Sequence, residues 1–215
     1  MGFVDPPLAV TSCRELVTFQ ALNARGEVLL KPVRRVVEEL GFVSIVEDGV
    51  DHVVCEIERT SARFEEEERS RQPSSFAVVR AVVDLFMGSD EHLGLYGAFG
   101  YDLAFQFEPI DLKLPRPGDQ RDLVLYVPDE IIVVDHQGGI AERRRYDFAY
   151  DGLDTADISR AGSREPYQPD LDLMSIRDHE SGEYAEVVEL AREYCARGDL
   201  FEVASSQTFV EPSPE

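Results

Sequence analysis

The residues of this chain that could carry out acid–base, nucleophilic or metal chemistry are scattered along the sequence. The four histidines lie on separate expected elements, with no Asp or Glu at metal-ligand spacing, which is typical of surface or packing histidines. The three cysteines are odd in number and form no Cys-x-x-Cys pair, so we expect buried thiols rather than disulfides or zinc ligands. No Gly-x-Ser-x-Gly elbow is present, and 43 acidic residues cannot be sorted into a catalytic pair without geometry. The histidines are His52, His92, His136 and His179, and the cysteines are Cys13, Cys55 and Cys195.

Two further patterns could bind phosphate, and neither is specific. Glycines recur every third residue at 94–100, but their spacing does not match Gly-x-Gly-x-x-Gly and no helix start follows. Glycines inside a strand usually mark a bulge or a close approach of another backbone, so we expect this strand to cross a neighbouring sheet or helix tightly. The basic run 143–145 is short, and it is more typical of a solvated strand surface than of a phosphate site.

Composition restricts the class of protein. The chain of 215 residues is 43% hydrophobic and 30% charged, which is ordinary for a globular fold. Its net charge of −22 disfavours binding to nucleic acid or to an anionic membrane, because both would repel it. No apolar run approaches the roughly 18 residues of a membrane span, and the N-terminus has no signal core. We therefore expect a cytoplasmic protein.

The first 150 residues alternate between strand and helix patterns. Strands arrive as hairpins rather than as regular βαβ units, which predicts an α+β fold with mixed or antiparallel sheets covered by helices. Pro32 fits a helix only in its first turn, so we place the start of that helix near residue 28. We expect strands at 8–11, 16–22, 53–57, 93–102, 123–127, 130–136 and 140–148, helices at 28–40 and 73–88, a turn at 23–26 and a solvated acidic block at 65–68.

The end of the chain has a different pattern. From 184 to 197 apolar residues recur with helical spacing, Gly198 is typical of a helix C-cap, and residues 201–209 alternate like a strand. A helix and a strand cannot cover their own apolar surfaces, so we expect most of a second domain to be missing from these residues. The predicted organisation is a domain at 1–150, a linker rich in Asp, Pro, Gly and Ser at 151–177, and the truncated start of a second domain at 178–215.

Several segments resemble component I of anthranilate synthase, and most closely the bacterial forms fused to a glutamine amidotransferase. The resemblance spans residues 3–212, and it implies that residues 1–150 are the N-terminal domain without its first strand and that 178–215 begin a chorismate-binding catalytic domain. The matching segments are DPPLA at 5–9, EEERS at 66–70, LGLYGAFGYDLAFQFE at 93–108, QRDL at 120–123, VPDE at 127–130 and the region 182–209.

The resemblance implies a lyase of tryptophan biosynthesis that converts chorismate and ammonia to anthranilate and pyruvate. In that family ammonia comes from glutamine through the amidotransferase partner, and Mg²⁺ binds the substrate carboxylate and helps the C4 hydroxyl to leave. The family's metal-binding glutamates and catalytic histidine follow residue 215. Tryptophan, the feedback inhibitor, binds partly through a serine-containing strand that precedes the Asp5-Pro6 segment. We therefore expect this fragment to be inactive, to hold no cofactor and not to bind tryptophan normally.

The resemblance also assigns one catalytic position, Glu202. Relatives that add water to chorismate carry a lysine general base there, and those that add ammonia usually carry a glutamine. Glu202 is not lysine and favours the ammonia branch, although it could equally be a polar strand residue paired with an arginine. Two alternatives to anthranilate synthase stay open. One is a sister enzyme that makes aminodeoxychorismate or 2-amino-2-deoxyisochorismate, and the other is a non-catalytic module that binds the amidotransferase.

Overall fold

The computed structural model describes residues 1–58, 72–107, 113, 115–161 and 176–210. By their contacts the residues divide into two compact units, Met1–Gly162 and Ser163–Glu215, called unit 1 and unit 2 below. Residues 151–161, assigned above to a linker, belong to unit 1 by these contacts. The identity of the two units as family domains stays a prediction, and the acidic block at 65–68 lies outside the described residues.

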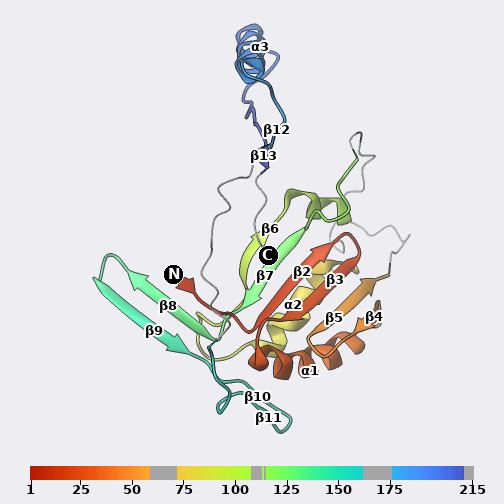
Figure 1. Ribbon diagram of the computed structural model, residues 1–215, viewed down its shortest axis with the longest axis vertical. Helices are drawn as coiled ribbons and strands as arrows, with labels where there is room; N and C mark the ends of the chain where they lie inside the picture. Colours follow the sequence, from red (N-terminus) through yellow and green to blue (C-terminus); the bar gives the residue numbers. More distant parts are fainter. Residues whose placement is uncertain (59–71, 108–112, 114, 162–175, 211–215) are drawn as a thin grey trace. The chain divides into compact units, whose positions relative to one another are not determined.

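Unit 1 is built on a six-stranded sheet in which every neighbouring pair of strands is antiparallel. Two helices, α1 (Ala24–Glu38) and α2 (Ser75–Phe86), lie against it (Figure 1). The α+β class with antiparallel sheets is therefore confirmed. In spatial order the strands are β4 (Val43–Asp48), β5 (His52–Ile57), β3 (Leu16–Ala21), β2 (Leu8–Cys13), β7 (Leu123–Val127) and β6 (Tyr96–Phe99).

The central hairpin shows why these strands form. Leu8 and Val10 on β2, and Val17 and Phe19 on β3, are fully buried and belong to the core that the helices cover. Burying each of these side chains contributes roughly 1.5–3 kcal/mol, so the alternating pattern specifies both the strands and their register. The hairpin expected at 8–22 is confirmed.

Helix α1 begins earlier than predicted. Asn23 is its N-cap, and the side-chain oxygen of Asn23 accepts hydrogen bonds from the backbone N–H groups of Arg25 and Gly26. The predicted turn at 23–26 is therefore wrong, and Pro32 lies inside the helix rather than in its first turn. A Cβ on Gly26 would lie 2.0 Å from the carbonyl oxygen of Pro7, so only glycine fits where this first turn meets the chain entering β2.

The glycine-rich run folds as the short edge strand β6 followed by a 3₁₀ helix, η2 (Tyr101–Gln106). A Cβ on Gly97 would lie 1.9 Å from the carbonyl oxygen of Val124 on β7. The predicted close backbone approach is confirmed, but the approaching backbone is the neighbouring strand of the same sheet rather than another sheet or a helix.

A second, three-stranded antiparallel sheet contains β1 (Gly2–Phe3), β8 (Glu130–Asp135) and β9 (Ile140–Arg145). It confirms the hairpin expected around residues 137–139. The basic run lies on β9, and each of its arginines pairs with a carboxylate: Arg143 and Arg145 with Glu130, and Arg144 with Asp90. These pairings confirm the interpretation as a strand surface. The two-residue strands β10 (Ala149–Tyr150) and β11 (Leu153–Asp154) pair after it.

Unit 2 contains the helix α3 (Glu183–Arg197) and a two-residue ladder between β12 (Ile176–Arg177) and β13 (Phe209–Val210). Helix α3 and its Gly198 cap, with a positive φ of 80°, are as predicted. The strand expected over 201–209 is wrong for 201–208, because only its end finds a pairing partner among the described residues. An alternating pattern forms a strand only where a neighbour supplies the hydrogen bonds.

Candidate functional site

Glu202, the one site residue assigned above, lies in the segment between α3 and β13. Glu202 is exposed, and the neighbouring Phe201 is exposed over its whole side chain at 103%. Among the described residues of unit 2, no ion pair involves Glu202, and the residue does not lie in a strand. Its role in catalysis stays a prediction.

The segment that carries Glu202 is held near its end by three hydrogen bonds. The backbone N–H of Thr208 donates to the side chain of Asp178 at 3.0 Å, and the backbone N–H of Asp178 donates to the carbonyl of Thr208 at 3.3 Å. The hydroxyl of Tyr184 on α3 donates to the carbonyl of Ser205 at 3.1 Å. These contacts fix residues 205–208 against Asp178 and the first turn of α3, and Glu202 stays exposed.

A carboxylate–imidazole pair lies at the base of this segment. The Nδ1 atom of His179 is 2.6 Å from Asp178 Oδ1, and this contact, together with the hydrogen bond from Thr208, lowers the pKa of Asp178 to about 2. The His179 ring packs edge-on against Tyr184 with 6.3 Å between ring centroids. Asp178 is therefore engaged in positioning the chain.

Helix α3 presents its apolar stripe on the surface of unit 2. Val187 and Tyr194 of the predicted stripe are each 39% exposed, Leu190 outside it is 52% exposed, and none of the helix's residues is buried. The stripe predicted from helical spacing is therefore present, and no layer among the described residues covers it.

The remaining chemically capable residues of the sequence do not converge on Glu202. Three of the histidines, His52, His92 and His179, lie next to carboxylates close to them in sequence. Across residues 1–58, 72–107, 115–161 and 176–210, no group of three or more His, Cys, Asp or Glu side chains could hold a metal ion.

The cysteines only partly match the expectation of buried thiols. Cys55 lies in the core, and burial raises the pKa of its thiol to about 12. Cys13 is half-buried and its Sγ donates to the carbonyl of Gly118 at 3.3 Å. Cys195 on α3 is exposed, so the prediction was wrong there, because the face of α3 that carries it has no partner among the described residues.

Unit 1 contains a buried ionic cluster that the sequence did not reveal. Arg25 on α1 is fully buried, pairs with the buried Asp129 and donates to Asp147 at 2.9 Å. Arg160 approaches the same two carboxylates. Burial raises the pKa of Asp129 against the opposing effect of the two arginines, whereas the hydrogen bond from Arg25 lowers the pKa of Asp147. The only sequence signal was that Asp129 belongs to the segment VPDE.

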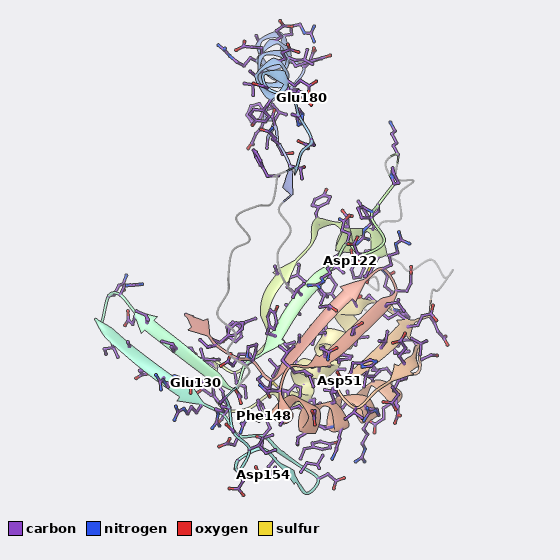
Figure 2. The ribbon with its side chains drawn as sticks, viewed as in Figure 1. Asp51, Asp122, Glu130, Phe148, Asp154 and Glu180 are labelled. Atoms are coloured by element: carbon purple, nitrogen blue, oxygen red, sulfur yellow. The ribbon has the colours of Figure 1, made fainter. Side chains whose placement is uncertain are left out.

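A second cluster joins two of the segments that carry the family resemblance. Asp102 of GYD and Asp122 of QRD both pair with Arg116, and Asp122, which Figure 2 labels, is buried. Asp122 also accepts a hydrogen bond of 2.6 Å from the backbone N–H of Arg14, which has a positive φ of 56° at the β2–β3 turn. These aspartates therefore hold together three loops of unit 1 and are engaged in structure.

Comparison with known proteins identifies relatives along nearly the whole chain. The anthranilate synthase of Azospirillum brasilense is 45% identical over 213 residues, which cover 99% of this chain and 29% of that protein. Anthranilate synthase component 1 of Vibrio parahaemolyticus is 29% identical, covering 98% of this chain and 41% of that protein. Anthranilate synthase component 1 of Escherichia coli is 25% identical, covering 98% of this chain and 42% of that protein.

The chain thus spans less than half the length of each of these relatives. No protein-family model matches it. No helix among the described residues has the length and apolar character needed to cross a membrane. Over nearly its whole length, this chain is similar to part of proteins named anthranilate synthase or anthranilate synthase component 1.

Proposed function

We propose that this chain is part of an enzyme that converts chorismate and ammonia to anthranilate and pyruvate, an oxo-acid lyase of tryptophan biosynthesis. The observation that carries the proposal is the 45% identity to the Azospirillum brasilense anthranilate synthase over 99% of the chain. The proposal places the enzyme in the cytoplasm, with a glutamine amidotransferase as partner and tryptophan as feedback inhibitor.

In this proposal the residues described here contribute little of the chemistry. Glu202 orients the incoming ammonia, which is already nucleophilic and needs no general base. Mg²⁺ serves the whole protein as Lewis acid at the substrate carboxylate, and none of the described residues is assigned to it. The 215-residue chain by itself is therefore inactive.

Two other functions remain as alternatives to be separated by experiment. A sister enzyme would add ammonia to chorismate and retain the pyruvyl group. One relative, 26% identical over 91% of this chain, is named anthranilate synthase component 1, pyocyanine specific. A non-catalytic module would bind the amidotransferase without turning over chorismate.

The test uses the complete product of the gene that encodes these residues, purified and incubated with chorismate, ammonium and Mg²⁺. We expect anthranilate, measured by its fluorescence, and pyruvate, measured with lactate dehydrogenase, in equal amounts. The 215-residue chain is assayed in parallel and should form neither product.

Each alternative has its own outcome in this assay. An aminated product without pyruvate would replace the proposal with the sister enzyme. Absence of turnover, together with binding of a glutamine amidotransferase, would replace it with the non-catalytic module.

A further inference from the structure

Residues 146–160, called the strap below, form the last described part of unit 1 before residue 161. They follow β9 and include β10 and β11, and Figure 2 labels two of them, Phe148 and Asp154. Thr155 is the only buried residue of the strap. Phe148 packs half-buried against the core, but no apolar side chain of the strap is fully buried, so hydrophobic burial holds the strap less strongly than it holds the sheet and the helices.

Among the described residues, Arg25 makes more polar contacts with the strap than any other side chain, and the ion pair Arg35–Asp151 is a further attachment to α1. Arg25 donates from Nη1 to the carbonyl of Thr155 and, at 3.0 Å, to that of Ile158. From Nη2 it donates to the carbonyl of Tyr146 and to Asp147 Oδ1, both at 2.9 Å. The fully buried guanidinium of Arg25 therefore donates hydrogen bonds to four different residues of the strap.

The other side of the same guanidinium faces the core. Its Nε atom pairs with Asp129, which is 1% exposed and lies just before β8. Asp129 compensates the buried charge of Arg25, and the backbone N–H of Tyr146 donates to the Asp129 carbonyl at 2.9 Å. Arg25 thus connects the strap to the folded body of unit 1.

Packing beneath the strap is incomplete. Phe148 contacts Phe86 of α2 edge-on, with ring centroids 5.3 Å apart. Beside this contact a hollow of about 220 Å³ remains between the strap and the two helices, lined on the helix side by Val28, Leu29 and Pro32 of α1 and by Leu85 of α2. A space of this size removes the dense contacts that would otherwise hold the strap.

We propose that the strap opens independently of the rest of unit 1 and that Arg25 is its latch. When the contacts of Arg25 are lost, residues 146–160 detach while the six-stranded sheet, α1 and α2 stay folded. Segments with few buried apolar contacts open locally at a lower free energy than the core. This inference goes beyond the proposed function and does not depend on it.

Opening frees the last described part of unit 1. The strap is 15 residues long and, fully extended, spans roughly 50 Å. Opening also exposes the apolar side of α1 and α2 that lines the hollow.

The test is backbone hydrogen exchange, measured by NMR on the 215-residue chain. The reporters are the N–H groups of Phe148, Thr155 and Ile158, each of which donates to an acceptor within the strap. The key variant is R25M/D129L, which removes the latch and its buried counter-ion together, so no uncompensated charge is left in the core. R34M is the matched control, because Arg34 on the same helix binds Asp48 and Gly49 and not the strap.

In R25M/D129L we expect the exchange rates of the three reporters to rise at least about 100-fold, while the rates of β2 and β7 amides change less than about threefold. R34M should leave the reporters unchanged. Unchanged strap protection in the double variant would show that the strap is held by other contacts. A parallel loss of protection in β2 and β7 would show that Arg25 belongs to the core. Either result overturns the proposal. R25M alone, which leaves buried Asp129 with only Arg160 at 3.6 Å, should be less stable than the double variant.

Discussion

The side-chain amide of Gln106 caps helix α2 from a segment 31 residues away. Its Oε1 atom accepts a hydrogen bond from the backbone N–H of Ser75 at 2.9 Å, and its Nε2 atom donates to the Ser75 hydroxyl at 2.9 Å and to the carbonyl of Arg14 at 3.1 Å. The Ser75 hydroxyl lies 2.9 Å from that of Ser12 on β2. One glutamine therefore joins η2, the start of α2 and the β2–β3 turn.

Replacing Gln106 by alanine should destabilise unit 1 by about 1–3 kcal/mol, because the variant leaves a helix N–H without its acceptor and removes one of the two partners of the Ser75 hydroxyl. Urea unfolding followed by circular dichroism measures this as a lower midpoint at constant slope. Q137A, on the exposed β8–β9 turn, is the control and should change stability by less than about 0.5 kcal/mol. Equal midpoints for the two variants would contradict the capping role.

Replacing Gly97 by alanine should destabilise unit 1 by roughly 2 kcal/mol or more, because its Cβ would lie 1.9 Å from the Val124 oxygen and 2.9 Å from the Leu125 Cα. Both are backbone atoms of β7 and cannot rotate away. A Cβ on Gly94 would meet nothing within 4 Å, so G94A is the matched control. Thermal unfolding compares the two, and a melting temperature for G97A as high as that for G94A would contradict the close approach.

The carboxyl of Asp90 should titrate far below its ordinary range. The backbone N–H of His92 and, to a smaller extent, the Arg144 guanidinium lower its pKa from 3.8 to about 2. A carboxyl whose pKa is lower in the folded state stabilises the protein above its unfolded pKa and loses this contribution as the pH falls. The stabilisation should therefore fade between about pH 4 and pH 2.

Carbon NMR of the carboxyl group follows this titration. In R144M the pKa of Asp90 should rise only part of the way towards 3.8, because the His92 N–H still donates to the carboxylate. R143M, whose arginine pairs with Glu130 instead, should leave the pKa of Asp90 unchanged. A pKa near 3.8 in the unmodified protein would show that neither contact persists in solution.

The thiols should differ in reactivity because they differ in burial. With Cys13 replaced by serine, one thiol should react with a disulfide reagent at once at pH 8, because Cys195 is exposed. The other, Cys55, should react only as the protein unfolds, since its pKa of about 12 and its burial leave almost no accessible thiolate. Adding C195S should abolish the fast phase, and a fast phase that persists would place Cys55 at the surface.

Glu202 can be tested only in the complete gene product. If it orients ammonia, E202A should lower kcat with ammonium at least about tenfold at unchanged melting temperature, and E202Q should retain most of the activity because an amide can still hydrogen-bond. E193A, at an exposed position of α3, is the control. Full activity in E202A would remove Glu202 from the site.

The local pattern of apolar and polar residues was sufficient to predict much of the fold of unit 1. Short apolar or alternating runs predicted β2, β3, β5 and β7, because each places apolar side chains on a buried face. Strand β4 has no counterpart among the expected strands, since it lies at the sheet edge, ends in exposed Glu47 and Asp48, and shows little apolar alternation.

The errors share a cause, namely that distant contacts override local signals. Pro32 suggested a helix start, but the Asn23 cap and the packing of α1 on the sheet begin the helix earlier. The alternation at 201–208 suggested a strand, but a strand also needs a neighbour to pair with.

By itself, the sequence determined the α+β class, most of the elements of unit 1, and the resemblance that the 45% identity later supported. Only the tertiary structure decided which polar groups meet. Arg25 reaches Thr155 across 130 positions and Gln106 reaches Ser75 across 31. The physical reason is that periodicity reports which side of an element is buried, whereas a buried charge or amide is stable only beside partners that folding brings from elsewhere in the chain.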